Sequence, residues 1–443
     1  MSIFISNRGA TLWGMFFSLI LFVWTMGCDD QVNSTTADVA VIAADIPLQD
    51  IGGAVGTPSG EGKVIGARKV GDVSSEYLWC LKETEDHGFV ASGHTRRAAN
   101  SANDAWLTRM DRDLNVLWSK SFSCGRNEHA YAVIPTRDNG VAFAGEMGIA
   151  RVADDLNLTE SYKYDAYIVK LDGEGEILWE RHYGGDDYDR ANDIGQTDDG
   201  GYVVAGHTQS YGALYKPEPH AKKDAWLFKL DDGGDIKWNL FYGEKDASEG
   251  LYAVCPAPGG GYMAAGFTDG AGAGGVDGLI MHVDGAGKLI WAHTLGGPKT
   301  DVARCIKPTV DGGYLVCGET MSSGNGLFDG WVVKLDNQGN VVWETTVGGG
   351  KFERAFAVLE TADRKVLVAG YTSSEGAGDK DMLLVCLSGD GALLWSNAYG
   401  GYSCDKASTL IQRADGAIMM AGPSSSYGNE EIDSLILTID PGS

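Results

Sequence analysis

A sequence motif that contains a tryptophan recurs along most of this chain. Its copies lie 52 to 61 residues apart, counted from tryptophan to tryptophan: Trp118, Trp179, Trp238, Trp291, Trp343 and Trp395. A repeat of this length indicates an array or a closed ring of equal modules, because one such module cannot bury its hydrophobic faces alone. The repeat therefore constrains the fold more than any local pattern does.

Each copy contains four short runs that are rich in Val, Ile, Tyr and Trp and are bounded by Gly and Asp turns, as β-strands are. We name these expected strands A, B, C and D. In the clearest copy they begin at Asp189, Gly201, Asp224 and Asp235. Strand C is apolar on both faces, so each small antiparallel sheet must be covered on two sides, as the radially packed blades of a propeller are.

The number of blades follows from the aspartate that opens strand C. It occurs in seven copies: Asp104, Asp165, Asp224, Asp277, Asp329, Asp381 and Asp433. Strand D follows only six of them, and the missing one matches residues 62–71, with Gly66 in place of the tryptophan. We therefore predict an all-β, seven-bladed β-propeller over residues 62–440, with four antiparallel strands per blade, closed by that N-terminal segment as the outer strand of the last blade.

The strand order with an N-terminal outer strand as clasp resembles that of WD-repeat and quinoprotein-like propellers. The phrases Asp-x-Trp-Leu-x-Lys-Leu-Asp and Gly-Gly-Tyr-x-Val-Ala-Gly-x-Thr resemble repeats of secreted and surface propeller proteins of bacteria. The resemblance covers residues 62–440 and implies that strand A is innermost. It implies no particular activity, because propellers serve as enzymes, scaffolds and lectins alike.

The first 27 residues have the pattern of a secretory signal, with Arg8 ahead of an apolar stretch. Cys28 follows a small residue and resembles the lipobox cysteine of bacterial lipoproteins, which implies a lipid anchor. Thr25 stands where that motif usually has leucine, so ordinary secretory cleavage and an uncleaved anchor stay as alternatives. Residues 28–61 follow, and we expect them to form a flexible tether. The expected location is outside the cytoplasm: a bacterial membrane-anchored lipoprotein, periplasmic or at the cell surface, or a secreted protein.

The formal net charge of −26 argues against nucleic-acid binding, because a phosphate backbone requires a basic surface. We expect contact with the membrane through the lipid anchor only. An acidic surface suits basic or divalent partners.

Strand A opens with an acid in every blade: Glu76, Glu128, Asp189, Glu249, Asp301, Glu353 and Asp405. If strand A is innermost, these acids surround one mouth of a central channel, where they could hold Ca²⁺ or attract a cationic ligand. The alternative is a structural role in accepting turn amides or pairing with nearby basic residues. We favour the structural role, because a binding site usually breaks the symmetry of its scaffold.

Symmetry is broken at two B–C loops, residues 147–164 and 209–223, which are longer than the others. Both lie on the face of the acid ring, and loops on a rigid scaffold often carry binding residues. They contain aromatic and basic candidates for binding: Arg151, Tyr162, Lys163, Tyr164, Tyr211, Tyr215, Lys216, His220, Lys222 and Lys223. The alternative is that they are surface loops without a binding role.

No catalytic signature and no cofactor motif is found in the sequence. The glycine-rich run at residues 270–275 leads into a strand and not into a helix, so it does not predict a dinucleotide site. Among the cysteines, only Cys305 and Cys317 are expected to lie close enough for a disulfide, because a tight hairpin joins their strands; plain buried thiols are the alternative.

The leading hypothesis is a binding or scaffold propeller of the cell envelope or surface. It would be lipid-anchored and would engage a protein or glycan partner through the face of the long loops of blades 2 and 3. One alternative is an enzyme similar to a polysaccharide lyase or a glycoside hydrolase, with acids of the channel mouth as its active site. Another is a structural module of a surface assembly.

Overall fold

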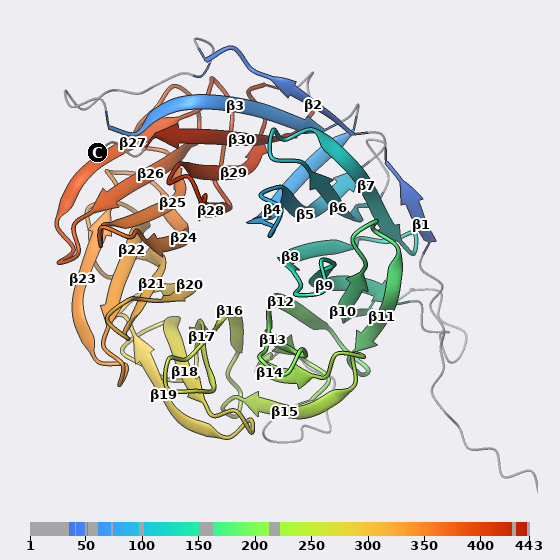
Figure 1. Ribbon diagram of the computed structural model, residues 1–443. Coiled ribbons are helices and arrows are strands. Elements are labelled where there is room, and N and C mark those ends of the chain that lie inside the picture. The colour runs from blue at the N-terminus through green and yellow to red at the C-terminus, as the bar shows by residue number, and fades with distance from the viewer. Residues whose placement is uncertain are drawn as a thin grey trace, which may run out of the picture. The chain divides into compact units, whose positions relative to one another are not determined.

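The computed structural model describes residues 35–39, 41–48, 51, 61–71, 74–96, 102–149, 163–211, 222–427 and 431–440. These residues form seven antiparallel sheets of four or five strands each. The sheets stand around a common axis as the blades of a ring (Figure 1). The prediction of an all-β, seven-bladed β-propeller is confirmed.

In blades 1 to 6 the strands follow the chain outward from the axis in the order A, B, C, D (Figure 1). Blades 1 to 3 consist of β4 (Ser75–Glu83), β5 (Phe89–Arg96), β6 (Asp104–Met110) and β7 (Val116–Ser123); β8 (His129–Pro135), β9 (Val141–Ile149), β10 (Lys163–Leu171) and β11 (Ile177–Tyr183); and β12 (Asp189–Gln196), β13 (Tyr202–Thr208), β14 (Asp224–Leu230) and β15 (Ile236–Tyr242). Blades 4 to 6 consist of β16 (Glu249–Pro256), β17 (Tyr262–Thr268), β18 (Asp277–Val283) and β19 (Leu289–Leu295); β20 (Asp301–Pro308), β21 (Tyr314–Thr320), β22 (Asp329–Leu335) and β23 (Val341–Val347); and β24 (Glu353–Glu360), β25 (Val366–Thr372), β26 (Asp381–Leu387) and β27 (Leu393–Tyr399).

Blade 7 is assembled from both ends of the described chain. Its inner strands are β28 (Thr409–Gln412), β29 (Ile418–Ser424) and β30 (Asp433–Asp440), and its outer strand is β3 (Lys63–Gly71). β3 pairs antiparallel with β30, with Ala67 opposite Leu437. This pairing confirms the predicted N-terminal clasp.

Two further strands lie in the segment for which the sequence predicts a tether. β1 (Thr35–Asp38) pairs with β7 of blade 1, and β2 (Ile42–Asp45) pairs with β3 of blade 7. The physical reason is that an outermost strand presents a row of unpaired backbone groups, which an extended segment can satisfy. The chain therefore crosses the seam between the first and last blades before it enters the clasp.

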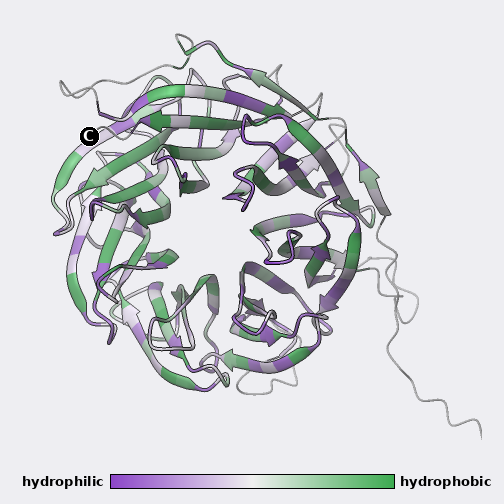
Figure 2. Cartoon of the chain, viewed as in Figure 1, coloured by the Kyte–Doolittle hydropathy of each residue, from purple (hydrophilic) through white to green (hydrophobic). Residues whose placement is uncertain are grey.

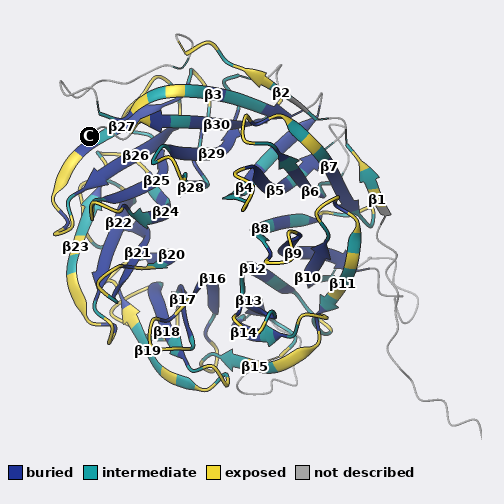
Figure 3. Cartoon of the chain, in the orientation of Figure 1, coloured by how far each residue is buried: buried dark blue, intermediate teal, exposed yellow. Residues whose placement is uncertain are grey.

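The blades pack through their middle strands. In blade 3 every residue of β13 is buried, as is all of β14 except Lys229. Hydrophobic residues gather along these strands (Figure 2), and the same strands are dark blue in the burial view (Figure 3). Ile168 of blade 2 and Trp226 of blade 3 belong to one buried cluster, so the core lies between blades and not within one blade.

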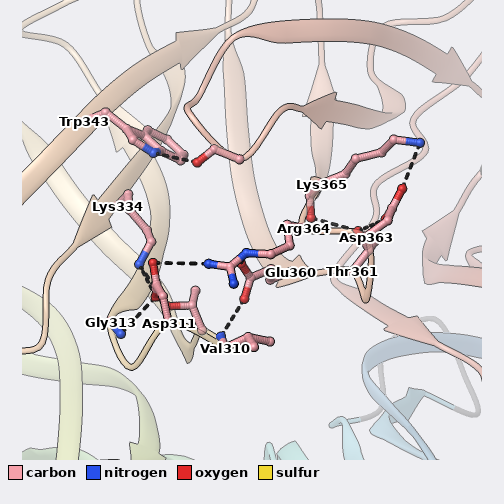
Figure 4. A network of polar contacts seen from close by, with 12 residues as sticks. Val310, Asp311, Gly313, Lys334, Trp343, Glu360, Thr361, Asp363, Arg364 and Lys365 are labelled. Atoms are coloured by element: carbon pink, nitrogen blue, oxygen red, sulfur yellow. Dashed lines mark hydrogen bonds and ion pairs between the residues drawn. The ribbon is translucent and has the colours of Figure 1, made fainter.

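Four of the six recurring tryptophans donate a hydrogen bond to the next blade. Trp179 donates a hydrogen bond from Nε1 to the carbonyl of Asp232, 2.9 Å away in the next blade, and Trp343 donates to Gly389 over 3.1 Å (Figure 4). At the seam, where Gly66 replaces the tryptophan, Arg68 donates to the carbonyl of Asp113 over 2.8 Å. An arginine of the clasp thus donates to a turn carbonyl of blade 1, as four of the tryptophans do between other blades.

Polar contacts also join the A–B turns of blades 5 and 6 (Figure 4). Lys334 Nζ lies 2.8 Å from Asp311 Oδ1, and Arg364 lies 3.6 Å from the other oxygen of Asp311. Glu360 accepts the backbone amide of Val310 over 2.7 Å. These contacts fix the turns on the face away from the strand A openings.

Within the described residues, no helix has the length and hydropathy that a membrane crossing needs. The signal, Cys28 and most of the predicted tether lie outside the described residues.

Candidate functional site

Strand A carries a β-bulge at the same place in each of blades 1 to 6. The register shifts by one residue in each pairing of strand A with strand B. The extra residues, which we call the axial ring, are Trp79, Tyr131, Asn192, Tyr252, Arg304 and Phe356. A bulge re-aims the side chain of its extra residue. Because the A strands surround the axis (Figure 1), the six bulges bring side chains of five different types to one level of the propeller.

Members of the axial ring contact one another across blade boundaries. The rings of Trp79 and Tyr131 have centroids 6.0 Å apart. The guanidinium of Arg304 lies 4.9 Å from the ring centroid of Tyr252 and 5.7 Å from that of Phe356. Five of the six are only partly buried, Asn192 being the exception, although their neighbours along the strands are mostly buried. The inner strands therefore present aromatic and cationic groups on a rigid scaffold.

In blades 2 and 3, the buried carboxylate of Glu146 binds several side chains in and beside the axial ring. Glu146 accepts hydrogen bonds from His129 Nδ1 over 2.9 Å, from the Tyr131 hydroxyl over 2.6 Å and from the Tyr188 hydroxyl. Arg190 Nε is 3.8 Å from Glu146, and the Arg190 guanidinium lies 3.7 Å above the Tyr131 ring. We call these five residues the Glu146 group.

The electrostatics of the Glu146 group fix its protonation. Burial by itself would raise the pKa of Glu146, but the hydrogen bond from His129 and the charge of Arg190 lower this pKa to about 2. Burial, together with the charges of His129 and Arg96, lowers the pKa of His94 to about 3. At neutral pH Glu146 is thus an anion that orients its neighbours, and His94 is uncharged.

A second carboxylate lies on the other side of the axis. Glu319 on β21 receives two hydrogen bonds from Arg304, each 2.6 Å long, in the two-pronged geometry that matches guanidinium to carboxylate. Arg354 Nε is 3.7 Å from the same carboxylate. Arg304 therefore has a fixed orientation within the axial ring.

The seven predicted acids at the start of strand A, Glu76 to Asp405, all have 0% exposure. Glu76, Glu249 and Glu353 each accept a threonine hydroxyl of strand B over 3.0 Å. Asp301 and Asp405 accept backbone amides of the preceding loop over 2.7 and 2.9 Å. These contacts are those of the structural role. Burial raises the pKa of Glu128 and of Glu249 to about 7.

Among the described residues, no group of three or more His, Cys, Asp or Glu side chains is arranged to hold a metal ion. Binding of Ca²⁺ by the seven acids that open strand A stays a prediction.

The loop candidates divide into two sets. Arg151, Tyr162, Tyr215, Lys216 and His220 lie outside the described residues. The described ones are Lys163, Tyr164, Tyr211, Lys222 and Lys223.

Two described loop candidates reach the Glu146 group. Tyr164 packs edge-on against Tyr188 at 5.6 Å, and Lys223 Nζ lies 5.5 Å from the centroid of the same ring. Two others form ion pairs nearby: Lys163 lies 3.9 Å from Asp187, and Lys222 lies 3.3 Å from Asp269.

Tyr211 has a different surrounding. Its ring packs on Trp226 and Phe241, and its hydroxyl donates to the carbonyl of Gly184 over 2.5 Å. It therefore supports the blade, although nearly half of it is exposed.

Cys305 and Cys317 face each other directly across β20 and β21, as the hairpin predicts. Both are free thiols in the structure, as are the five other described cysteines.

The sequence reasoning missed the axial ring. A signal was present in the aligned copies, at the position three residues after the opening acid. From Trp79 to Phe356 the residue type at this position changes from blade to blade, and only tyrosine occurs twice, as Tyr131 and Tyr252. The opening acid itself hardly varies. The varied positions, and not the repeated ones, mark where the scaffold is specialised.

No family model matches this chain, and no curated protein does. Solved structures similar to it include the WD40 domain of Neurospora crassa Pan2, with TM-score 0.47, 10% identity, and coverage of 83% of this chain and 90% of that one. The polysaccharide lyase Uly1 matches with TM-score 0.48, 11% identity, and coverage of 82% and 90%. A puromycin hydrolase mutant matches with TM-score 0.47, 13% identity, and coverage of 79% and 50%. At these identities the likeness concerns the fold alone.

Proposed function

We propose that this chain is a binding propeller of the bacterial cell envelope or surface, anchored through a lipid on Cys28, that engages a protein or glycan partner. The partner contacts the face on which the A strands begin and the long B–C loops of blades 2 and 3 emerge. The observation that carries this proposal is the axial ring, where an otherwise regular scaffold places a different side chain in nearly every blade.

The chemistry of the region supports binding. Aromatic side chains and arginine are the residues that contribute most to recognition surfaces, and in the axial ring they come from strands. Tyr164 and Lys223 extend the region toward the bases of the two long loops. The surface so defined consists of the axial ring, the Glu146 group, and Tyr164 and Lys223 beside it.

Binding is favoured over catalysis by the state of the carboxylates. A glycoside hydrolase needs a carboxylic acid that is protonated near neutral pH. Glu146, with a pKa of about 2, is ionised there, and Glu319 is held in the fork of Arg304. Glu146 is therefore not a proton donor near neutral pH. The mouth acids Glu128 and Glu249 have pKa values of about 7, but both have 0% exposure, so neither lies open to a substrate.

The test is binding of the purified chain to envelope fractions, with Tyr252→Ala as the probe variant. We expect it to weaken binding about 30-fold or more, because loss of an aromatic anchor at a recognition surface costs about 2 kcal/mol or more. Leu178→Ala, which removes an exposed side chain of the outer strand β11, is the matched control. Equal binding by both variants and the unaltered chain would refute the proposed face.

The anchor is tested separately. Cys28→Ser should move the protein from the membrane fraction to the soluble fraction and abolish incorporation of labelled fatty acid. Unchanged fractionation would exclude the lipid anchor without affecting the proposed binding face.

A further inference from the structure

Three cationic side chains converge on one tyrosine in blades 6 and 7. Lys380 Nζ lies 5.4 Å from the ring centroid of Tyr371, and Lys406 Nζ lies 5.9 Å from it. Arg354 stands directly opposite Tyr371 in the register of β24 and β25. We call Arg354, Lys380 and Lys406 the cationic cluster.

The backbone holds this cluster in place. The amide of Asp405 donates to the carbonyl of Lys380 over 2.7 Å, so the residues before β26 and β28 are fastened side by side. Lys406 follows directly, and its amide donates to the carbonyl of Pro423 over 3.0 Å. The two lysines come from different blades and are brought together by the packing of those blades.

Among the described residues, only Arg354 of this cluster has a carboxylate within ion-pair distance. Its Nε lies 3.7 Å from Glu319, but both oxygens of Glu319 already accept hydrogen bonds from Arg304. That Nε is buried and has no hydrogen-bond partner. In the part of the chain that the structure describes, neither Lys380 nor Lys406 forms an ion pair with a carboxylate.

Such an arrangement is unusual in a chain with a net charge of −26, where acids outnumber bases. Like charges that are partly withdrawn from water repel each other, and burial raises their free energy further unless an anion completes the group. All three side chains are only partly buried, so an external anion can reach them. The two lysines that form no ion pair within the described residues point to an anionic ligand.

Aromatic rings surround the cations. The Arg354 guanidinium lies 5.2 Å from the ring centroid of Phe328, which stacks with Phe352 at 6.2 Å, and Phe352 is 39% exposed. Phe356 of the axial ring lies on the same strand as Arg354, two residues further on. Cations next to apolar rings suit a ligand that carries an acidic group on a compact body with an apolar face.

We infer that the cationic cluster binds the carboxylate or sulfate group of an acidic carbohydrate, whose sugar ring packs on the neighbouring aromatic side chains. This inference rests on the proposed function and names its ligand class. Arg354 supplies the directional hydrogen bonds, and the two lysines supply charge that is not committed to a protein carboxylate.

The test is calorimetric titration with paired polysaccharides. The acidic members are polygalacturonate and alginate for carboxylates and chondroitin sulfate and dextran sulfate for sulfates; the controls are carboxyl-reduced, desulfated or neutral counterparts. We expect at least one acidic member to bind at least about 10-fold more tightly than its counterpart, with an affinity that falls as salt rises. The carboxylate and sulfate arms identify the acidic group. Failure of every acidic member to bind would overturn the inference.

The residues are tested by Arg354→Gln, Lys380→Met and Lys406→Met, each of which keeps most of the side-chain stem. We expect each to weaken binding about 10- to 100-fold, the usual effect of losing a hydrogen bond to a charged group. Lys237→Met is the matched control, because Lys237 is exposed on the outer strand β15 and pairs with Asp231.

A structural role for the lysines would give a different result. Because removing one cation relieves repulsion, Lys406→Met should leave the midpoint of thermal unfolding unchanged or raise it. A lowered midpoint would overturn the inference. So would binding of a neutral glycan or a protein that depends on Tyr252 but not on the cationic cluster, an outcome that would leave the proposed function standing.

Discussion

Gly206 faces the backbone carbonyl of Arg190 so closely that a Cβ atom on Gly206 would lie 1.8 Å from that oxygen. The close approach is produced by the bulge of β12, where Ala191 pairs with Gly206 but Asp193 pairs with Ala205. The glycine of the repeated Ala-Gly-x-Thr phrase therefore makes room for the bulged strand. Without that space, Asn192 could not leave the ladder, nor could its counterparts in the other blades.

Replacing this glycine should damage the blade. We expect Gly206→Ala to lower the free energy of unfolding by about 1–3 kcal/mol, the range for overpacking a tight interior, because the Cβ would meet backbone that cannot move freely. Denaturant unfolding measures the change. Gly259→Ala is the control, since a Cβ there meets no atom within 4 Å. Equal stability of the two variants would contradict the proposed link between glycine and bulge.

The clasp and the two strands before it should contribute unequally to stability. Deleting residues 35–45 removes β1 and β2 from outer edges but leaves the ring closed, so we expect the thermal midpoint to fall by only a few degrees. A chain truncated through residue 71 also loses β3, which leaves the edge of β30 unpaired. We expect that chain to aggregate or to lose cooperative unfolding. A monomeric, cooperatively folding product would show that the clasp is dispensable.

Burial of Glu249 should make stability depend on pH above the acid range. Burial raises its pKa from 4.5 to about 7. Its favourable contribution to the free energy of unfolding is therefore full below pH 4.5 and is lost as the pH rises through about 7. Glu249→Gln cannot ionise and keeps an oxygen that can accept from Thr268. Its stability relative to the unaltered chain should increase between pH 5 and pH 8. Denaturant unfolding at several pH values tests this, with exposed Glu174→Gln as control.

Glu146 should have the opposite pH dependence. Its pKa is lowered from 4.5 to about 2, so the stability it provides is full above pH 4.5 and is lost as the pH falls toward 2. We expect Glu146→Gln to be less stable by about 3 kcal/mol near neutral pH, because Arg190 would lose its buried carboxylate. The difference from the unaltered chain should shrink below pH 4. Parallel pH profiles for the two proteins would argue against this account.

The opposed thiols Cys305 and Cys317 give a redox prediction. The hydrogen bond from Cys317 lowers the pKa of the Cys305 thiol, and a thiolate is the reactive form. We expect a mild dithiol oxidant to join this pair, with loss of two hydrogens that the oxidant accepts. Peptide mapping identifies the linkage, and Cys305→Ser should abolish it. Oxidation that instead links other cysteines would contradict the prediction.

The sequence alone determined the number of blades, their strand order and the clasp. Each of blades 1 to 6 has its four repeat strands in one stretch of chain with its own turns, and the match of residues 62–71 to the missing strand D could be read directly from the repeat. These features depend on local pattern, and a repeated pattern gives several independent chances to recognise it.

Only the tertiary structure decided what the inner strands present. In sequence, the acids Glu76 to Asp405 were the prominent feature of strand A, yet the structure buries them against threonine hydroxyls and turn amides. Trp79, Tyr131 and Arg304 were inconspicuous, because a register shift cannot be seen without the partner strand. The meeting of Lys380 and Lys406 over Tyr371 requires two blades at a fixed separation. Ring closure sets that separation, and closure is a property of all seven blades together.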